Sequence, residues 1–203
     1  MKSKDTNTES SILDAAESIF QRKGMDGARM QEIANEAGIN KAMLHYYYKS
    51  KQLLFGAVFK KAFGLLAPQL NAILNDDSSI EIKIRNFANS YISFISKHPY
   101  LPSFIIMELN KNPDFILKLK ENPSFPNLVK FKNQVEKEIE NGILKPIIGE
   151  QLFINIISLC IFPFVASPLI KAFVDINDSE FKVLMEARKT EVANFIIDAI
   201  KIS

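Results

Sequence analysis

The stretch "QEIANEAGINKAMLHYYY", residues 31–48, decides the fold. Its first half repeats apolar residues at helical spacing: Ile33, Ala34 and Ala37. Gly38 then breaks the repeat, and Asn40 can cap a second short helix that ends near Tyr48. The stretch therefore predicts two short helices joined by a tight turn, which is the helix-turn-helix layout. Corners between two helices that bind nothing share this layout, so the layout alone leaves that alternative open.

The second helix of this stretch has two different faces. At about 100° per residue, Leu44 and Tyr48 lie close together, and we expect both to face the core. Ala42 and Tyr46 then point outward. The outward face is flanked by three more residues: Met43, His45 and Tyr47. Tyrosine hydroxyls can bond to phosphate and tyrosine rings can pack on thymine methyl groups, so this face suits a nucleic acid.

The charge of the chain is unevenly distributed. The formal net charge is only +2, so the molecule as a whole is not a polycation. No residue between Glu36 and Asp76 is acidic, yet five lysines fall there: Lys41, Lys49, Lys51, Lys60 and Lys61. A local field of one sign favours a polyanionic partner. Lys49 and Lys51 follow the second helix directly, where we expect them to contact phosphate.

The longer stretch "ILDAAESIFQRKGMDGARMQEIANEAGINKAMLHYYYKSKQLL", residues 12–54, closely resembles the DNA-binding domain of the tetracycline-repressor (TetR) family. The shared features are the "ILDAA" start, the "KG" that ends the first helix, "IA" and "AGI" across the turn, and an aromatic residue followed by "KSK". The resemblance implies an all-α, TetR-like fold. Residues 1–51 would form an N-terminal helix-turn-helix domain of three helices, and residues 52–203 a C-terminal helical domain for ligand binding and dimerisation.

The resemblance also implies a function. Members of this family are homodimeric transcriptional regulators, more often repressors than activators, that bind a palindromic operator in double-stranded DNA. A small hydrophobic effector would release the protein from this operator. Carried onto this sequence, the family pattern gives a set of candidate DNA-binding residues: Arg29, Gln31, Lys41, Ala42, Met43, His45, Tyr46, Tyr47, Lys49 and Lys51.

The sequence departs from the family pattern on the reading surface. Ala28-Arg29-Met30 stands where Thr or Ser usually precedes the second helix, so a capping hydroxyl and one phosphate contact are missing, although Arg29 could reach a phosphate instead. His45 stands where tyrosine is usual, and Tyr48 where phenylalanine is usual. These changes affect the expected operator sequence and leave the expected fold intact.

The rest of the chain is predicted to be helices with marked breaks. A first helix is expected from Thr8 to Gly24, and a fourth from Ser50 to Pro68. Further helical segments are expected near residues 79–97, 99–109, 124–142, 150–170 and 179–201, with boundaries at X-Pro pairs. Residues 151–170 carry no charge over about the length of a membrane span, but Asn155, Pro163 and Pro168 interrupt them. We therefore expect a helix buried on most sides and no membrane span.

Phenylalanine is concentrated in the second part of the chain, where fifteen of the sixteen lie beyond residue 51. The resemblance implies a ligand cavity in this part, and eight residues are candidates for its wall: Tyr91, Phe94, Phe104, Met107, Phe115, Phe125, Phe131 and Phe153. Such a wall would suit an apolar ligand. The alternative is ordinary core packing, which is the default for apolar residues at helical spacing.

The last two helical segments carry wide apolar surfaces. In the family, two such helices from each chain form a four-helix dimer interface, which makes eight residues candidates for that interface: Leu159, Phe162, Phe181, Leu184, Met185, Val192, Phe195 and Ile196. So wide an apolar surface usually finds a partner. The alternative is packing within one chain.

Several function classes find no support in the sequence. Two histidines and one cysteine cannot form a metal cluster, and we expect no cofactor. Glycine-rich phosphate loops, nucleophile elbows and catalytic carboxylate pairs are absent, so we expect no enzyme. The polar N-terminus and single cysteine fit the cytoplasm. The competing hypothesis is a helical protein-interaction module with a vestigial helix-turn-helix.

Overall fold

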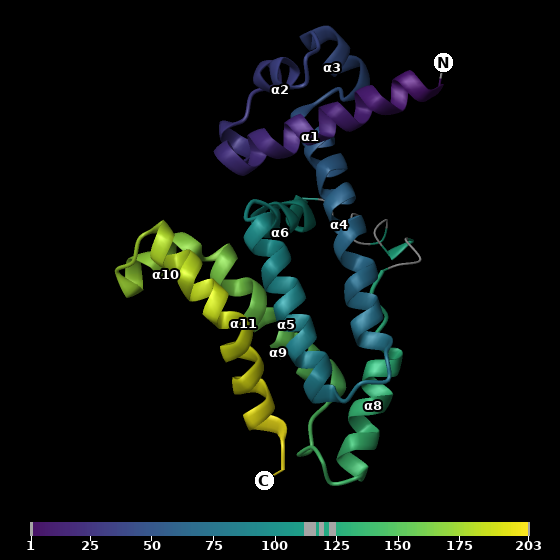
Figure 1. Ribbon diagram of the computed structural model, residues 1–203, viewed down its shortest axis with the longest axis vertical. Coiled ribbons are helices and arrows are strands. Elements are labelled where there is room, and N and C mark those ends of the chain that lie inside the picture. The colour runs from purple at the N-terminus through teal and green to yellow at the C-terminus, as the bar shows by residue number, and fades with distance from the viewer. Residues whose placement is uncertain (1, 112–116, 118–119, 122–124, 203) are drawn as a thin grey trace. The chain divides into compact units, whose positions relative to one another are not determined.

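The computed structural model describes residues 2–111, 117, 120–121 and 125–202 (Figure 1). Their regular secondary structure is helical, with one isolated β-bridge between Leu144 and Lys201. The predicted all-α fold is confirmed. Contacts divide the chain into two compact units, Met1–Leu65 and Leu66–Ser203.

The first unit contains α1 (Lys2–Gly27), α2 (Met30–Glu36), α3 (Lys41–Tyr47) and the first part of α4 (Lys51–Asn75). Helix α1 begins six residues before the expected cap at Thr8, because no proline or glycine in this polar segment interrupts a helix. Gly24 breaks α1 as predicted, with a φ of 65° that favours glycine. Gly38, with a φ of 68°, makes the turn between α2 and α3.

Phe20 and Phe55 form the centre of the small core in this unit. Their ring centroids lie 4.5 Å apart, and both side chains are buried. Around them, α1, α2, α3 and α4 contribute further buried residues: Ile12, Ala16, Ile33, Ala34, Leu44, Leu54 and Val58. Because Phe55 lies on α4, the start of this helix is part of the first unit. The division by contacts thus falls at residue 65, whereas the sequence suggested a boundary after Lys51.

Helix α4 continues through Pro68 to Asn75, so the expected end at Pro68 is wrong. A proline inside a helix removes one hydrogen bond, here to the carbonyl of Gly64 four residues earlier. Gly64 is exposed, so water can satisfy its carbonyl oxygen. Apolar residues that follow the proline keep the helix folded by entering the core: Leu70 and Leu74.

A buried lysine closes the C-terminal end of α4. The side chain of Lys83 is fully buried, and its ammonium group donates to the Ile73 carbonyl at 3.2 Å and to the Asp76 carbonyl and carboxylate, each at 2.7 Å. Desolvation acts to raise the pKa of Asp76, but hydrogen bonds from Lys83 and Ser78 outweigh it and hold that pKa below its ordinary value. The carbonyls of Ile73 in α4 and of Asp76 just after it therefore accept hydrogen bonds from a charged donor.

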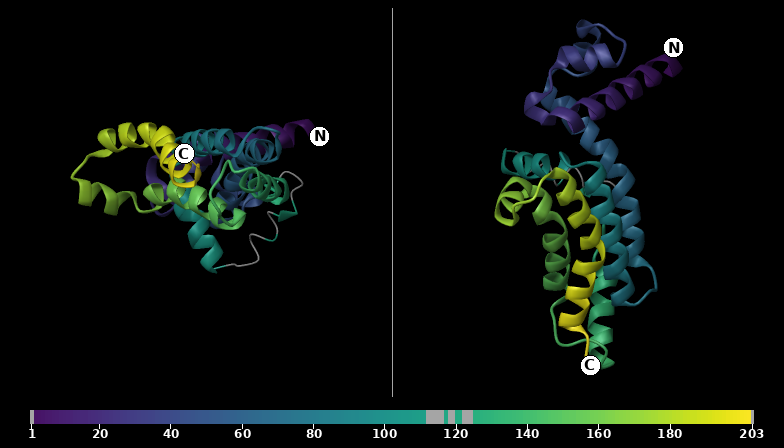
Figure 2. Two further views of the ribbon diagram at one scale, coloured as in Figure 1. Left: turned by 90° about the horizontal axis from the view of Figure 1, so that it is seen from below. Right: turned by 60° about the vertical axis from the view of Figure 1, so that its left-hand side comes forward.

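The second unit is built around α5 (Ile80–Lys97), α9 (Gly149–Val165) and α11 (Asp178–Ile200), which contact one another and lie side by side in Figure 2. Helix α8 (Val129–Glu140) packs on α5 and α9, and α6 (Leu101–Lys111) packs on α9. One apolar core runs through this unit, and its members include Phe87, Ile92, Phe131, Leu152, Ile156, Met185 and Ile196.

The expected single helix over residues 150–170 is two helices. Helix α9 ends at Val165, and α10 (Ser167–Val174) leaves at an angle of 78° after Ala166. Pro168 in the first turn of α10 favours a new start, since its fixed φ suits that position. By length and composition α4 passes the test for a membrane span, and α9 with α10 passes only as a bent pair. Buried core helices pass the same test, and α4 buries Leu66, Leu70 and Leu74.

Arg188 on α11 compensates for a proline in α9. Pro163 has no N–H to give to the carbonyl of Leu159, four residues earlier. The guanidinium of Arg188 donates to this carbonyl twice, from Nε at 3.0 Å and from Nη2 at 2.9 Å. A charged side chain from the neighbouring helix thus replaces the missing backbone donor and fixes α11 against α9.

We predict that Arg188→Met lowers the free energy of unfolding by about 1–3 kcal/mol, because it leaves the Leu159 carbonyl without its donor. Urea unfolding followed by circular dichroism measures this change. Lys182→Met is the control, since Lys182 is an exposed cation on the same helix and its loss should change stability by less than about 0.5 kcal/mol.

A double mutant tests the cause. In a Pro163→Ala background the alanine amide can donate to Leu159, so Arg188→Met should then cost about 1 kcal/mol less than in the parent. If the cost is the same in both backgrounds, Arg188 stabilises the protein in some other way.

Candidate nucleic-acid interface

Helix α3 is short and has a defined start. The Asn40 side chain accepts a hydrogen bond from the Met43 amide at 2.8 Å, which is the predicted N-cap. The amide of Ile39 donates to the Ala34 carbonyl at 3.0 Å and closes the turn after α2. Leu44 is completely buried and holds α3 on the core of the first unit. These contacts fix the rotation of α3 about its axis.

The opposite face of α3 is open, as predicted. Tyr46 has 81% of its surface exposed, and Ala42, Met43 and His45 are exposed as well. Tyr47 is half-buried, and its ring meets that of Tyr46 edge to face, with centroids 5.6 Å apart. The pair forms a small aromatic ridge on the outward side of α3.

Tyr48 does not lie in the core beside Leu44, so this part of the prediction is wrong. The residue follows α3 with an extended backbone, φ −133°, and its side chain therefore leaves the helical register. It is half-buried, and its hydroxyl donates to the carboxylate of Glu9 on α1 at 3.0 Å. Burial, the hydrogen bond to Glu9 and the charge of Glu9 all raise the pKa of Tyr48. Tyr48 thus ties the end of α3 to α1.

The lysines in and after α3 have different surroundings. Lys41 and Lys49 are exposed. The ammonium group of Lys51 instead donates to the carbonyls of Asp26 and Ala28, at 3.2 and 3.1 Å, where the chain leaves α1. Lys51 was expected to contact phosphate, but these two bonds give it a structural role. Nothing in the sequence pattern distinguishes it from Lys49.

Helix α2 starts without a side-chain cap. Arg29 occupies the cap position through its backbone alone, with its carbonyl accepting from the Glu32 and Ile33 amides, and its side chain is exposed. This agrees with the loss of a capping hydroxyl that the sequence suggested. Gln31 is also exposed, and its amide donates to Asn35 at 2.9 Å.

The acidic side chains of α2 are paired with basic residues of α1. Glu32 lies 3.0 Å from Lys23, and Glu36 lies 3.2 Å from Arg22. The hydrogen bond from Lys23 lowers the pKa of Glu32, so this carboxyl remains ionised and neutralises a cation of α1. The charges nearest to the open face of α3 along the chain are therefore those of Lys41 and Lys49, both positive.

Comparison with known proteins adds the family. The family model described as "Bacterial regulatory proteins, tetR family" matches residues 12–58. The match begins within α1, includes all of α2 and α3, and ends in the first part of α4. Residues 12–58 therefore belong to the TetR family. This is a family of transcription regulators, and its members in this comparison are regulators and not enzymes.

Two curated relatives share about half of the chain. The transcriptional regulator RutR of Escherichia coli is 29% identical over 98 residues, which are 48% of this chain and 46% of RutR. The transcriptional repressor SCO4008 of Streptomyces coelicolor is 31% identical over 101 residues, 50% of this chain and 49% of the relative. The match thus spans about half the length of these relatives.

The fold extends the likeness to the whole chain. The crystal structure of a TetR-family transcriptional regulator from Mesorhizobium loti superposes with a TM-score of 0.62 at 18% identity. The superposition covers 97% of this chain and 98% of that protein. At this identity the likeness concerns the fold alone.

The residues expected to line one effector cavity lie in several places. Phe87 stacks on Tyr91 and meets Phe153, with centroids 5.4 and 5.9 Å apart, and Phe153 in turn meets Phe131 at 6.4 Å. Burial raises the pKa of Tyr91, as expected for a core position. Tyr91, Phe131 and Phe153 therefore form an aromatic cluster that is packed ring against ring.

The other expected cavity residues lie elsewhere. Phe94 packs on His98, with centroids 4.6 Å apart, and Met107 lines a separate open pocket with Ile106 and Val165. Phe115 and the side chain of Phe104 lie outside the described residues. Phe125, also expected in that cavity, lines a different pocket, and the sequence analysis named none of the other residues of its lining.

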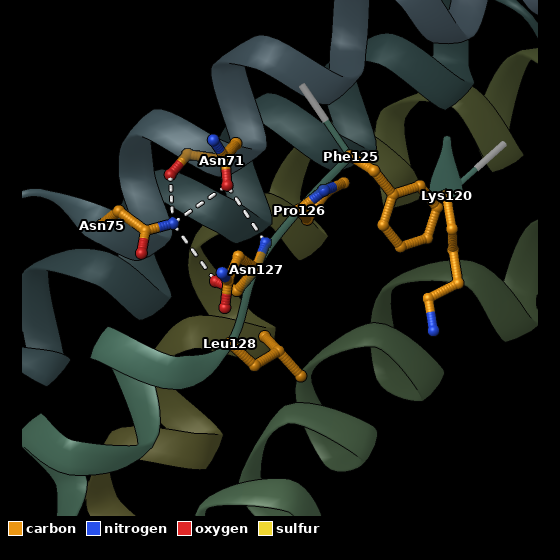
Figure 3. A pocket seen from close by; sticks show the side chains of 7 residues that line it. All are labelled: Asn71, Asn75, Lys120, Phe125, Pro126, Asn127 and Leu128. Carbon is orange, nitrogen blue, oxygen red and sulfur yellow. Dashed lines mark hydrogen bonds between the residues drawn. The ribbon is translucent and has the colours of Figure 1, made fainter. Parts of the chain in front are cut away.

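This pocket has a volume of about 520 Å³ and lies where α4 meets the segment before α8 (Figure 3). Its polar side is a network of amides: Asn75 donates to Asn71 and to the Asn127 carbonyl, and the Asn127 amide donates to Asn71. The remaining lining is one cation and three apolar residues: Lys120, Phe125, Pro126 and Leu128. It is a mixed polar and apolar surface. In the sequence, the two asparagines near the end of α4 only weakly indicate this pocket, because asparagine is also common at helix ends and in turns for other reasons.

The residues expected at a dimer interface divide into two groups. Phe181, Met185, Val192 and Ile196 are buried in the core of their own chain, so they are not free for a partner. Phe162, Leu184 and Phe195 are exposed, and Leu159 is half-buried. Only the second group is available for contact with another chain.

Potential metal ligands do not gather in the part of the chain that the structure describes. Within residues 2–111, 117, 120–121 and 125–202, no three side chains of His, Cys, Asp or Glu are grouped so that they could hold a metal ion. The single cysteine, Cys160, is buried, and burial raises the pKa of its thiol to about 12. This thiol is therefore protonated and serves as an apolar core residue.

We predict that Lys51→Met lowers the free energy of unfolding by about 1–3 kcal/mol, because two carbonyls lose a charged donor. Lys49→Met is the matched control and should leave stability within about 0.5 kcal/mol of the parent, since Lys49 is exposed. Urea unfolding followed by circular dichroism measures both. Equal stability of the two variants would show that Lys51 does not hold the end of α1.

Proposed function

We propose that the chain is a DNA-binding transcriptional repressor that uses α3 to read a palindromic operator. The observation that carries this proposal is the two-sided nature of α3: Leu44 is fully buried, and Tyr46 on the opposite side is 81% exposed. A recognition helix needs both properties, because it must be held by the core while it offers side chains to the major groove.

The chemistry of the open face suits DNA. The rings of Tyr46 and Tyr47 offer apolar contact to thymine methyl groups and hydroxyls to phosphate or base edges. His45 and Met43 flank them and would contribute to sequence preference. Two lysines near the two ends of α3, Lys41 and Lys49, would contact phosphate and give affinity without sequence information. Arg29 and Gln31 at the start of α2 would add contacts with the DNA backbone.

A palindromic operator requires two copies of α3, so the proposal includes a homodimer. The exposed apolar residues of α9 and α11 support it: Phe162, Leu184 and Phe195. Two such helices from each copy would form the interface. As a bacterial DNA-binding regulator the protein would act in the cytoplasm, and RutR and SCO4008, named as a regulator and a repressor, support this class of function.

A ligand-sensing role is the second part of the proposal. The pocket around Phe125 combines apolar side chains with amides and the Lys120 ammonium, so it suits an amphipathic molecule better than a purely hydrophobic one. Asn71 and Asn75 on its wall belong to α4, which starts at Lys51, four residues after α3 ends. Binding at the end of α4 would bias the position of α3 through this one helix.

The decisive test of DNA binding is to pass fragments of the source genome over the purified protein, identify those retained, and measure affinity against salt. Phosphate contacts release counterions, so the logarithm of the association constant should fall linearly with the logarithm of salt concentration. A helical protein-interaction module would retain no fragment selectively and show no such slope.

We predict that Tyr46→Ala weakens binding to the retained site by about 1–3 kcal/mol and weakens binding to unrelated DNA less. Its melting temperature should stay close to that of the parent, because the side chain is exposed. Fluorescence anisotropy and thermal unfolding measure these effects. Tyr48→Phe is the control: it removes the bond to Glu9 but leaves the open face of α3 unchanged. If both variants lose the same affinity, the assignment of the reading face is wrong.

A further prediction concerns the pocket. Some amphipathic compounds in a screened panel should raise the melting temperature of the parent and release it from the operator, and Phe125→Ala should reduce both effects. Switching nearly all molecules requires about 5.5 kcal/mol of preference for the released state. Val129→Ala, an exposed change outside the pocket lining, is the control. A compound that stabilises the fold through Phe125 yet leaves DNA affinity unchanged would show a pocket without a switch.

A further inference from the structure

Helix α10 has no buried residue. Its large apolar side chains are open to solvent, with Phe173 78% exposed, Val174 55% and Leu169 51%. A helix of eight residues is marginal by itself in water, and helices in proteins are stabilised chiefly by the burial of an apolar face. Within its own chain α10 packs the partly buried Ile170 against the core but leaves Leu169, Phe173 and Val174 uncovered.

The base of α10 is nevertheless held firmly. Lys171 forms an ion pair with Asp178 at 2.5 Å, and its ammonium lies 6.0 Å from the centre of the Phe181 ring. The Ile176 amide donates to the Lys171 carbonyl at 3.1 Å and closes the end of the helix. A capping box of Asn177 and Glu180 then starts α11. The helix is therefore a fixed projection at 78° to α9, about 12 Å long.

The composition of α10 restricts its partner. Lys171 is the only charged residue in the sequence Ser167–Val174, and Asp178 already neutralises it. The exposed surface is thus apolar and without net charge. DNA, an anionic membrane surface or an acidic protein would all need free positive charge, which α10 does not offer.

The area required for a stable dimer points to a second copy. Phe162, Phe173 and Phe195 are 55%, 78% and 67% exposed. A phenylalanine buries roughly 200 Å² in full, so these three offer roughly 400 Å², half of what one partner gives to a standard interface. Phe173 contributes the largest share. Helices α9 and α11 without α10 would offer much less aromatic surface.

We propose that α10 is an arm that packs through Leu169, Phe173 and Val174 on a second copy of this chain, beside the contact made by α9 and α11. The inference rests on the proposed homodimer. Only one residue separates α10 from α9, and only three separate it from α11, so the arm has a fixed position next to the exposed residues of both helices. Figure 1 shows α10 at the outer edge of the second unit, with α11 leading back from it toward α5.

The experiment measures the dimer dissociation constant of the full-length chain by sedimentation equilibrium. Phe173→Ser should weaken dimerisation by about 10- to 100-fold, as expected when one buried aromatic is lost. Phe195→Ser tests the contact of α11 separately. Val129→Ser, an equally simple change of an exposed apolar residue on α8, should leave the constant unchanged. Circular dichroism of each variant verifies that the fold is retained.

The outcomes separate the two proposals. If Phe195→Ser weakens the dimer and Phe173→Ser does not, the proposed contact through α10 is wrong, while the proposed homodimer is supported. If the parent chain is monomeric at every concentration, both proposals are wrong. A weaker dimer in both variants, with Val129→Ser unchanged, supports the arm.

A spin label gives an independent readout. Val174→Cys can be labelled selectively, because the natural Cys160 is buried. The label should become less mobile as the concentration rises through the dissociation constant. A label that stays mobile in the dimer, or that is immobilised only by neutral or anionic lipid vesicles, would overturn the proposal.

Discussion

The contact between Phe20 and Phe55 is the constraint on which the first unit depends. It joins α1 to α4, and together with other buried residues such as Leu44 of α3 it gives a very small domain an apolar centre. Small cores leave little margin, so each buried aromatic accounts for much of the stability. With Leu44 held in this core, the rotation of α3 is determined, and Tyr46 must face outward. The candidate reading surface is therefore a consequence of core packing on the other side of the same helix.

Basic residues in this chain serve two different purposes. Lys51 satisfies carbonyls at the end of α1, Lys83 does so at the end of α4, and Arg188 does so beside Pro163 in α9. Each compensates for backbone acceptors that the helix itself leaves without donors. These contacts lie between residues distant in sequence, so a count of positive charge along the chain cannot separate them from cations that face solvent. The charge available for DNA is smaller than the sequence suggests.

Periodicity predicted what depends on local geometry. The two short helices, the glycine turn, the Asn40 cap and the outward face of α3 all follow from spacing within a few residues. Three features did not follow. Pro68 does not end α4, because tertiary burial of Leu70 and Leu74 outweighs the lost hydrogen bond. The apolar run of residues 151–170 bends at Ala166, where hydropathy gives no signal. Tyr48 leaves the helical register one residue after α3 ends, so the 100° rule no longer applies to it.

Helix α11 shows why the apolar pattern of the sequence could not distinguish a buried core residue from an exposed one. Phe195 and Ile196 are adjacent and similarly hydrophobic, yet Ile196 is buried against its own chain and Phe195 is 67% exposed. The helix is apolar on two sides, and α5 and α9 cover only one of them. A helix that is apolar on both sides is stable in water only if both are covered. Only the three-dimensional packing therefore distinguishes the inner face of α11, which is buried in its own chain, from the outer face, which is exposed.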